Sequence, residues 1–256
     1  MTQHYLIGGN GTQSVHLNLR MANRHGLIAG ATGTGKTVTL QVLAEGFAKA
    51  GVPVFMADIK GDLSGLAKAG KPHPKVDERI QLMGISDYQQ RLFPCVFWDL
   101  YAQQGHPVRA TISDFGPLLL ANFFDLNETQ TGVLYAAFKI ADDQGMLLLD
   151  LKDLQAMLNW MKDERKNLED EYGGLSEASI AAIQRRLMML EQEGADHFFG
   201  EPALDLNHLM QVTLEGTGVI NNLRSIGYSI RLFFQSFKMS KRFKISKVSG
   251  NIPCSF

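Results

Sequence analysis

The chain has 256 residues, a formal net charge of −1 and 45% apolar residues, which suits one large domain or one domain with a subdomain. This composition excludes a disordered chain, and the presence of only two cysteines excludes a disulfide scaffold. No apolar run approaches the roughly 20 residues of a membrane helix, and no signal sequence is visible, so we expect a cytoplasmic protein.

The first part of the chain predicts an α/β domain. Turn residues at 8–11 separate two strand-like segments, which predicts a β-hairpin over residues 1–24. A short strand at 25–29 precedes a glycine-rich turn, a helix at 36–50 and a second strand at 52–57. A strand, a helix and a strand in this order imply a parallel sheet with a right-handed crossover. Further strands at 96–98 and 108–112 extend this predicted core over residues 25–112.

From residue 113 onward the pattern becomes helical. Asn127 and Gln130 are spaced as a capping box before a helix at 133–141, and Asp150 with Asp153 offers a similar start before 151–161. The segment 175–193 is amphipathic and is followed by Gly194, a typical helix stop. We therefore expect a mostly helical insertion over residues 113–221.

Residues 30–37, Gly-Ala-Thr-Gly-Thr-Gly-Lys-Thr, match the phosphate-binding pattern G-x-x-x-x-G-K-[ST]. Glycines let successive backbone N–H groups face a phosphate, and the helix that follows adds positive charge from its N-terminus. Lys36 is expected to neutralise the β- and γ-phosphates, and the Thr37 hydroxyl to bind the Mg²⁺ that bridges them. The predicted nucleotide-binding residues are Gly30, Ala31, Thr32, Gly33, Thr34, Gly35, Lys36 and Thr37.

Hydrolysis of a bound triphosphate also requires an acidic residue at the end of a second strand. Three aspartates follow apolar runs: Asp58, Asp99 and Asp150. Asp150 lies where a helix N-cap belongs, and Asp99 is compatible with an ordinary strand end. Asp58 ends the strand after the phosphate-loop helix, where parallel sheets place their ligands, and it opens the segment Asp58-Ile-Lys-Gly-Asp62. We therefore take Asp58, with Lys36, as the candidate catalytic residues.

The charge distribution changes abruptly near the end of the chain. Residues 222–256 contain seven Lys and Arg and no Asp or Glu, and the last acidic residue is Glu215. This basic tail has three interpretations: a solvated surface, an arm that binds nucleic acid, or a sequence that is not native to the protein.

Five segments together resemble the bacterial HerA-like ATPases, a branch of the HerA/FtsK superfamily of ring-forming motor ATPases. They are residues 30–37, 52–66 (VPVFMADIKGDLSGL), 108–121, 139–154 and 194–206. The resemblance extends over roughly residues 3–221. It implies a RecA-like P-loop core with a helical insertion, ATP and Mg²⁺ as cofactors, hexamers, and double-stranded DNA as the track.

Beyond residue 221 the sequence departs from the pattern of that family, which continues to an apolar strand ending in Asp-Glu and then to an arginine-bearing segment. A frameshift or a truncated gene model would explain this departure and the loss of acidic residues together. We therefore expect a fold that is incomplete at the C-terminus and a chain that binds ATP without hydrolysing it. Two alternatives stay open: a small-molecule P-loop kinase, and a non-catalytic module that binds nucleotide or DNA.

Overall fold

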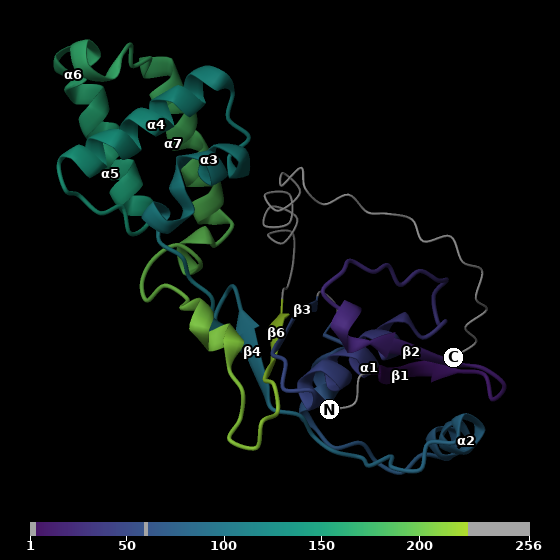
Figure 1. Ribbon diagram of the computed structural model, residues 1–256. Helices are drawn as coiled ribbons and strands as arrows, with labels where there is room; N and C mark the ends of the chain where they lie inside the picture. Colours follow the sequence, from purple (N-terminus) through teal and green to yellow (C-terminus); the bar gives the residue numbers. More distant parts are fainter. Residues whose placement is uncertain (1–3, 59–60, 225–256) are drawn as a thin grey trace. The chain divides into compact units, whose positions relative to one another are not determined.

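The computed structural model describes residues 4–58 and 61–224, and this part of the chain divides into two compact units (Figure 1). The first unit contains the chain up to Phe97 together with Leu206–Arg224, and the second is Trp98–Asp205. The first holds the strands around the phosphate loop, and the second is mostly helical. The mixed α/β class with a parallel sheet, predicted from the sequence, is confirmed.

The first unit begins with an antiparallel hairpin of β1 (His4–Gly9) and β2 (Ser14–Asn18). Helix α1 (Lys36–Lys49) and strand β3 (Val54–Asp58) follow the phosphate loop. Strand β3 pairs in parallel with β6 (Ile220–Arg224), which comes from the far end of the described chain. The order in the sheet is β3-β6-β4-β5, where β4 is Cys95–Asp99 and β5 is His106–Pro107. A small apolar core joins α1 to this sheet: Ala44, Ala48, Leu66, Phe93 and Ile220.

Two predicted strands are corrected by the structure. Residues 25–29 form no strand, and Leu27 is 66% exposed, because no strand of the described chain lies beside this segment to share a hydrogen-bond ladder. The strand predicted at 108–112 is reduced to an isolated bridge between Ala110 and Phe199, since helix α3 already begins at Ile112. The strand paired with β4 lies just before, at His106–Pro107.

The second unit consists of helices α3 (Ile112–Phe123), α4 (Glu128–Asp143), α5 (Leu151–Asp163), α6 (Arg165–Tyr172) and α7 (Glu177–Gln192). Both predicted caps are confirmed: Asn127 forms a capping box with Gln130, and Asp150 forms one with Asp153. Helix α6 and, in the first unit, helix α2 (Pro74–Met83) were not predicted from the sequence. Helix α2 has Val76, Ile80 and Met83 at helical spacing, but with 10 residues it is short, and it buries none of them fully.

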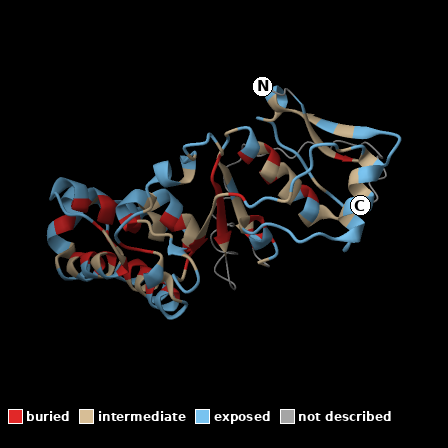
Figure 2. Cartoon of the chain, turned by 90° about the horizontal axis from the view of Figure 1, so that it is seen from below, coloured by how far each residue is buried: buried red, intermediate tan, exposed pale blue. Residues whose placement is uncertain are grey.

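The core of the second unit lies between the helices, and Figure 2 shows buried and exposed residues on the same helices. Its largest fully enclosed side chains include Leu134, Ile140, Leu154, Leu158, Ile180 and Ile183. At the start of α3, Phe115 meets Phe198 and Phe199 edge to face. No helix in the described ranges combines the length and the apolar character needed to cross a bilayer.

The hairpin of the first unit packs against the phosphate-loop helix at Gly46. A Cβ at this position would collide with the ring of Tyr5 in β1, so the absence of a side chain is what allows the ring to lie against α1. Burial first, and then the nearby carboxylate of Glu45, raise the pKa of Tyr5 to about 12. This contact joins strand β1, at the start of the described chain, to the helix that follows the glycine-rich loop.

A matched pair of glycine substitutions tests that contact. Gly46→Ala forces the Tyr5 ring aside, and we expect this collision to lower the free energy of unfolding by about 1–3 kcal/mol. The higher helix propensity of alanine offsets part of that loss. Gly132→Ala, in α4, meets no atom within 4 Å and is expected to stabilise by about 0.5–1 kcal/mol. Urea unfolding followed by far-ultraviolet circular dichroism measures both, and equal effects of the same sign would contradict this packing.

Candidate nucleotide-binding site

The phosphate loop owes its shape to three glycines. Gly33 and Gly35 have φ angles of 83° and 89°, a region in which other residues are strained. A Cβ on Gly30 would collide with the Thr34 hydroxyl, so the turn closes only around a residue without a side chain. Helix α1 begins at Lys36 directly after Gly35, which has no side chain to cap it. The first N–H groups of the helix therefore face outward as donors for an anion.

The Lys36 ammonium group lies over this loop. Its Nζ donates to the carbonyl oxygen of Gly30 at 2.8 Å and to that of Ala31 at 2.5 Å. The Thr34 hydroxyl donates to the same Ala31 carbonyl at 2.8 Å, which narrows the turn. Charged phosphate oxygens are stronger acceptors than neutral carbonyls, so a bound phosphate can take the place of these two carbonyl oxygens as the acceptor for Lys36.

The loop that follows β3 is fastened to the first turns of α1. The Thr37 hydroxyl donates to Oδ2 of Asp62 at 3.3 Å, and Nε2 of Gln41 donates to the Asp62 carbonyl oxygen at 3.2 Å. The predicted metal ligand thus has a carboxylate beside it. The sequence has Asp62 in the segment after β3, whereas the predicted catalytic acid is Asp58. The signal for Asp62 was its place on the loop beyond a strand end, although its contact with Thr37 bridges 25 residues of sequence.

Asp58 binds the backbone of that loop. The residue is 3% exposed, and its carboxylate accepts the N–H of Gly61 at 2.7 Å and that of Leu63 at 2.9 Å. A third, longer bond comes from the side-chain amide of Asn222 in β6, at 3.5 Å. The catalytic role predicted for Asp58 stays a prediction, and the contacts of its carboxylate are with the loop backbone and the neighbouring strand.

The two other candidate acids also bind backbone groups, within the second unit. Asp99 is 1% exposed and accepts the N–H groups of Tyr101, Gln103 and Gln104 at 2.8–3.0 Å, so it closes the turn after β4. Asp150 accepts the N–H groups of Lys152 and Asp153, as expected of the N-cap of α5.

The donor set around the phosphate loop fits Mg²⁺ that arrives with a nucleotide. Within residues 4–58 and 61–224, no three His, Cys, Asp or Glu side chains gather as a protein-only metal site. Mg²⁺ needs less than that, because it typically takes one or two protein oxygen ligands and completes its shell with phosphates and water. Thr37 and Asp62 provide oxygen atoms of this kind beside the loop.

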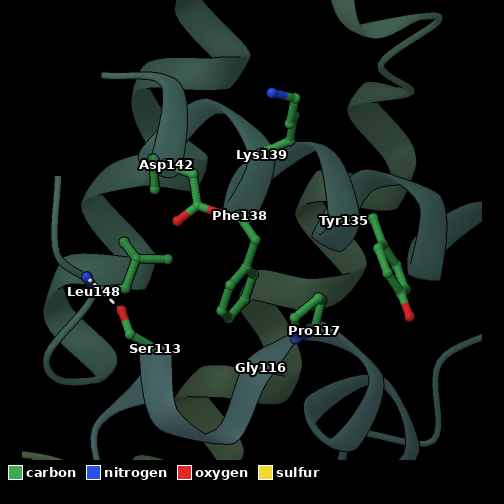
Figure 3. A pocket seen from close by; sticks show the side chains of 9 residues that line it. Ser113, Gly116, Pro117, Tyr135, Phe138, Lys139, Asp142 and Leu148 are labelled. Atoms are coloured by element: carbon green, nitrogen blue, oxygen red, sulfur yellow. Dashed lines mark hydrogen bonds between the residues drawn. The ribbon is translucent and has the colours of Figure 1, made fainter. Parts of the chain in front are cut away.

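The second unit contains a cavity of a different character, with a volume of about 360 Å³ (Figure 3). Its walls come from α3, α4 and the segment around Leu148, and the ring of Phe138 lies toward Pro117. Two of its polar lining residues have partners in the fold: the Ser113 hydroxyl accepts the Leu148 N–H at 3.0 Å, and Lys139 pairs with Asp143. This cavity has no set of backbone donors like that of the phosphate loop.

Removing the Asp58 carboxylate should loosen the loop that carries Asp62. In Asp58→Ala the N–H groups of Gly61 and Leu63 lose their acceptor, and we expect the free energy of unfolding to fall by about 1–3 kcal/mol. Asp58→Asn keeps one acceptor oxygen and should lose less. Asp87→Ala, an exposed acid in the same unit, is the control and should stay within about 0.5 kcal/mol of wild type. Chemical denaturation measures all three, and an Asp58→Ala variant as stable as the control would show that these bonds contribute nothing.

The comparisons with known proteins show the family of the chain. No curated protein resembles the chain closely enough to count as a relative. The family described as helicase HerA-like C-terminal matches residues 3–234, a range that includes the phosphate loop, Asp58 and Asp62. This match confirms the HerA-like resemblance inferred from the sequence, and it covers most of the 256 residues. The chain belongs to the helicase HerA-like C-terminal family.

Proposed function

We propose that this chain binds ATP with Mg²⁺ at residues 30–37 and supplies the nucleotide-binding part of a HerA/FtsK-type motor ATPase. One observation carries the proposal: the glycine loop opens directly into α1, with the Lys36 amine over the loop and the Thr37 hydroxyl beside a carboxylate. Membership of the helicase HerA-like family supports the same reading of the site as that of a motor ATPase.

Each part of the loop has a distinct task in this proposal. Backbone N–H groups of the loop and of the first turn of α1 bind the phosphate oxygens, and the helix N-terminus adds about half a positive charge. Lys36 leaves the carbonyls of Gly30 and Ala31 and neutralises the outer phosphates. Thr37 offers its hydroxyl oxygen to the metal. Bound Mg²⁺ would supply further positive charge to the same phosphates.

The motor function itself is the broader part of the proposal. By analogy with its family, the chain would assemble as a hexamer and couple ATP hydrolysis to movement along double-stranded DNA. Residues 1–221 carry more acidic than basic groups, whereas 222–256 are basic. We therefore expect any DNA contact made by this chain to involve the basic tail, which after Arg224 lies outside the described residues.

Replacing Lys36 tests the nucleotide site directly. In Lys36→Ala the outer phosphates lose a charged donor, and we expect binding of Mg·ATP to weaken by about 1.5–3 kcal/mol, or roughly ten- to a hundredfold. Lys71→Ala removes an equal charge from an exposed loop of the same unit and should leave the affinity unchanged. Isothermal titration calorimetry distinguishes the two, and equal affinities of wild type and Lys36→Ala would contradict the site.

We expect the purified chain to bind ATP but to hydrolyse it at background rate, with or without DNA. This expectation is supported by the contacts of the candidate acids. The carboxylates of Asp58, Asp99 and Asp150 already accept backbone N–H groups, and that of Asp62 accepts the Thr37 hydroxyl. A phosphate-release assay measures the turnover.

Turnover of about 1 s⁻¹ or faster that is lost in Lys36→Ala would contradict this expectation. Single Asp→Asn variants at positions 58, 62, 99 and 150 would then identify the acid that supports hydrolysis.

A further inference from the structure

We propose that Asp62 is a metal-positioning residue. Its carboxylate accepts the hydrogen bond of the Thr37 hydroxyl and so orients the lone pairs of the hydroxyl oxygen toward the Mg²⁺ of the bound nucleotide. This assignment rests on the proposed ATP site and adds to it the group that makes binding depend on the metal. It follows from the contact between Thr37 Oγ1 and Asp62 Oδ2, at 3.3 Å.

The chemistry of the hydroxyl supports the assignment. A threonine hydroxyl has one proton to donate and two lone pairs to offer. Once the proton is directed to the Asp62 carboxylate, both lone pairs are free for a cation. Groups that orient a metal ligand in this way typically contribute about 10–100-fold to metal affinity.

The backbone around Asp62 is held in place on both sides. The N–H groups of Gly61 and Leu63 are bound by the Asp58 carboxylate, and the Asp62 carbonyl accepts from Nε2 of Gln41 on α1. Gly61 has a φ of 77°, which bends the chain so that the next residue can face the helix. The exposed Asp62 side chain is thus presented to Thr37 by a loop that is anchored at its base.

The negative charge of Asp62 is expected to raise the affinity for ATP when Mg²⁺ is present and to lower it when the metal is absent. A carboxylate beside the loop repels the phosphates of free ATP, but it attracts a divalent cation that those phosphates bring. Asp62→Asn removes both effects and keeps the size of the side chain. A change that only damaged the fold would weaken binding under both conditions.

Calorimetry of Asp62→Asn, with Mg·ATP and with ATP in excess EDTA, tests the proposal. We expect the affinity for Mg·ATP to fall about tenfold or more, and the affinity for ATP in EDTA to stay equal or to rise. Asp87→Asn, an exposed acid in the same unit, should change neither value. In addition, Thr37→Ala should weaken Mg·ATP binding. In the Thr37→Ala background, Asp62→Asn should lower the Mg·ATP affinity much less than it does in the wild type, because Asp62 acts through Thr37.

Three results would overturn the assignment. They are an unchanged Mg·ATP affinity in Asp62→Asn, an equal loss with metal and in EDTA, and full additivity of the two substitutions. If wild type bound no ATP under either condition, the proposed nucleotide site would fail and this assignment with it. If the wild type and Asp62→Asn bound Mg·ATP with equal affinity, the role assigned to Asp62 would be wrong while the proposed nucleotide site would stand.

Discussion

The parallel pairing of β3 with β6 is the constraint on which the candidate site depends. It joins residues 54–58 to residues 220–224, and it fixes where β3 ends. The buried side-chain amide of Asn221 adds to this junction by donating to the carbonyl of Leu209 at 3.0 Å. Because β3 ends beside α1, the loop that follows it can reach the helix at Thr37 and Gln41. Without β6, Asp58 would lose a neighbour on the strand that carries it.

The site is then assembled from two loops with different sources of rigidity. The phosphate loop is shaped by glycine conformations and by hydrogen bonds within residues 30–36. The loop after β3 is shaped by the buried carboxylate of Asp58. One loop supplies donors for phosphate, and the other brings a carboxylate to the hydroxyl next to them. The acid at the end of β3, Asp58, therefore contacts the backbone of the loop, and it is Asp62 that contacts Thr37.

The two units differ in the size of their own apolar cores. The helical unit has an extensive apolar core to which all five of its described helices contribute, whereas the first unit has a small one around α1 and the sheet. The first unit also exposes large apolar side chains, with Phe55 of β3 at 53% and Leu27 at 66%.

The features that the sequence predicted well are those made by residues close together in the chain. The hairpin at β1–β2, the capping boxes at Asn127 and Asp150 and the phosphate loop into α1 each depend on neighbours a few residues away. The helices α2 and α6 were not predicted. They have 10 and 8 residues, which is too short for an apolar period to stand out in the sequence.

Features that depend on distant partners needed the folded chain. Residues 25–29 have the composition of a strand, yet they form none, because a strand exists only where a neighbour completes its hydrogen bonds. Residues 220–224 do form one, because β3 lies beside them. The sequence likewise placed an acid near the phosphate loop, but Asp58, the last residue of β3, and Asp62, on the loop after it, are only four residues apart. Which of the two carboxylates turns inward to the backbone and which reaches Thr37 is a matter of packing against α1, and no local pattern records it.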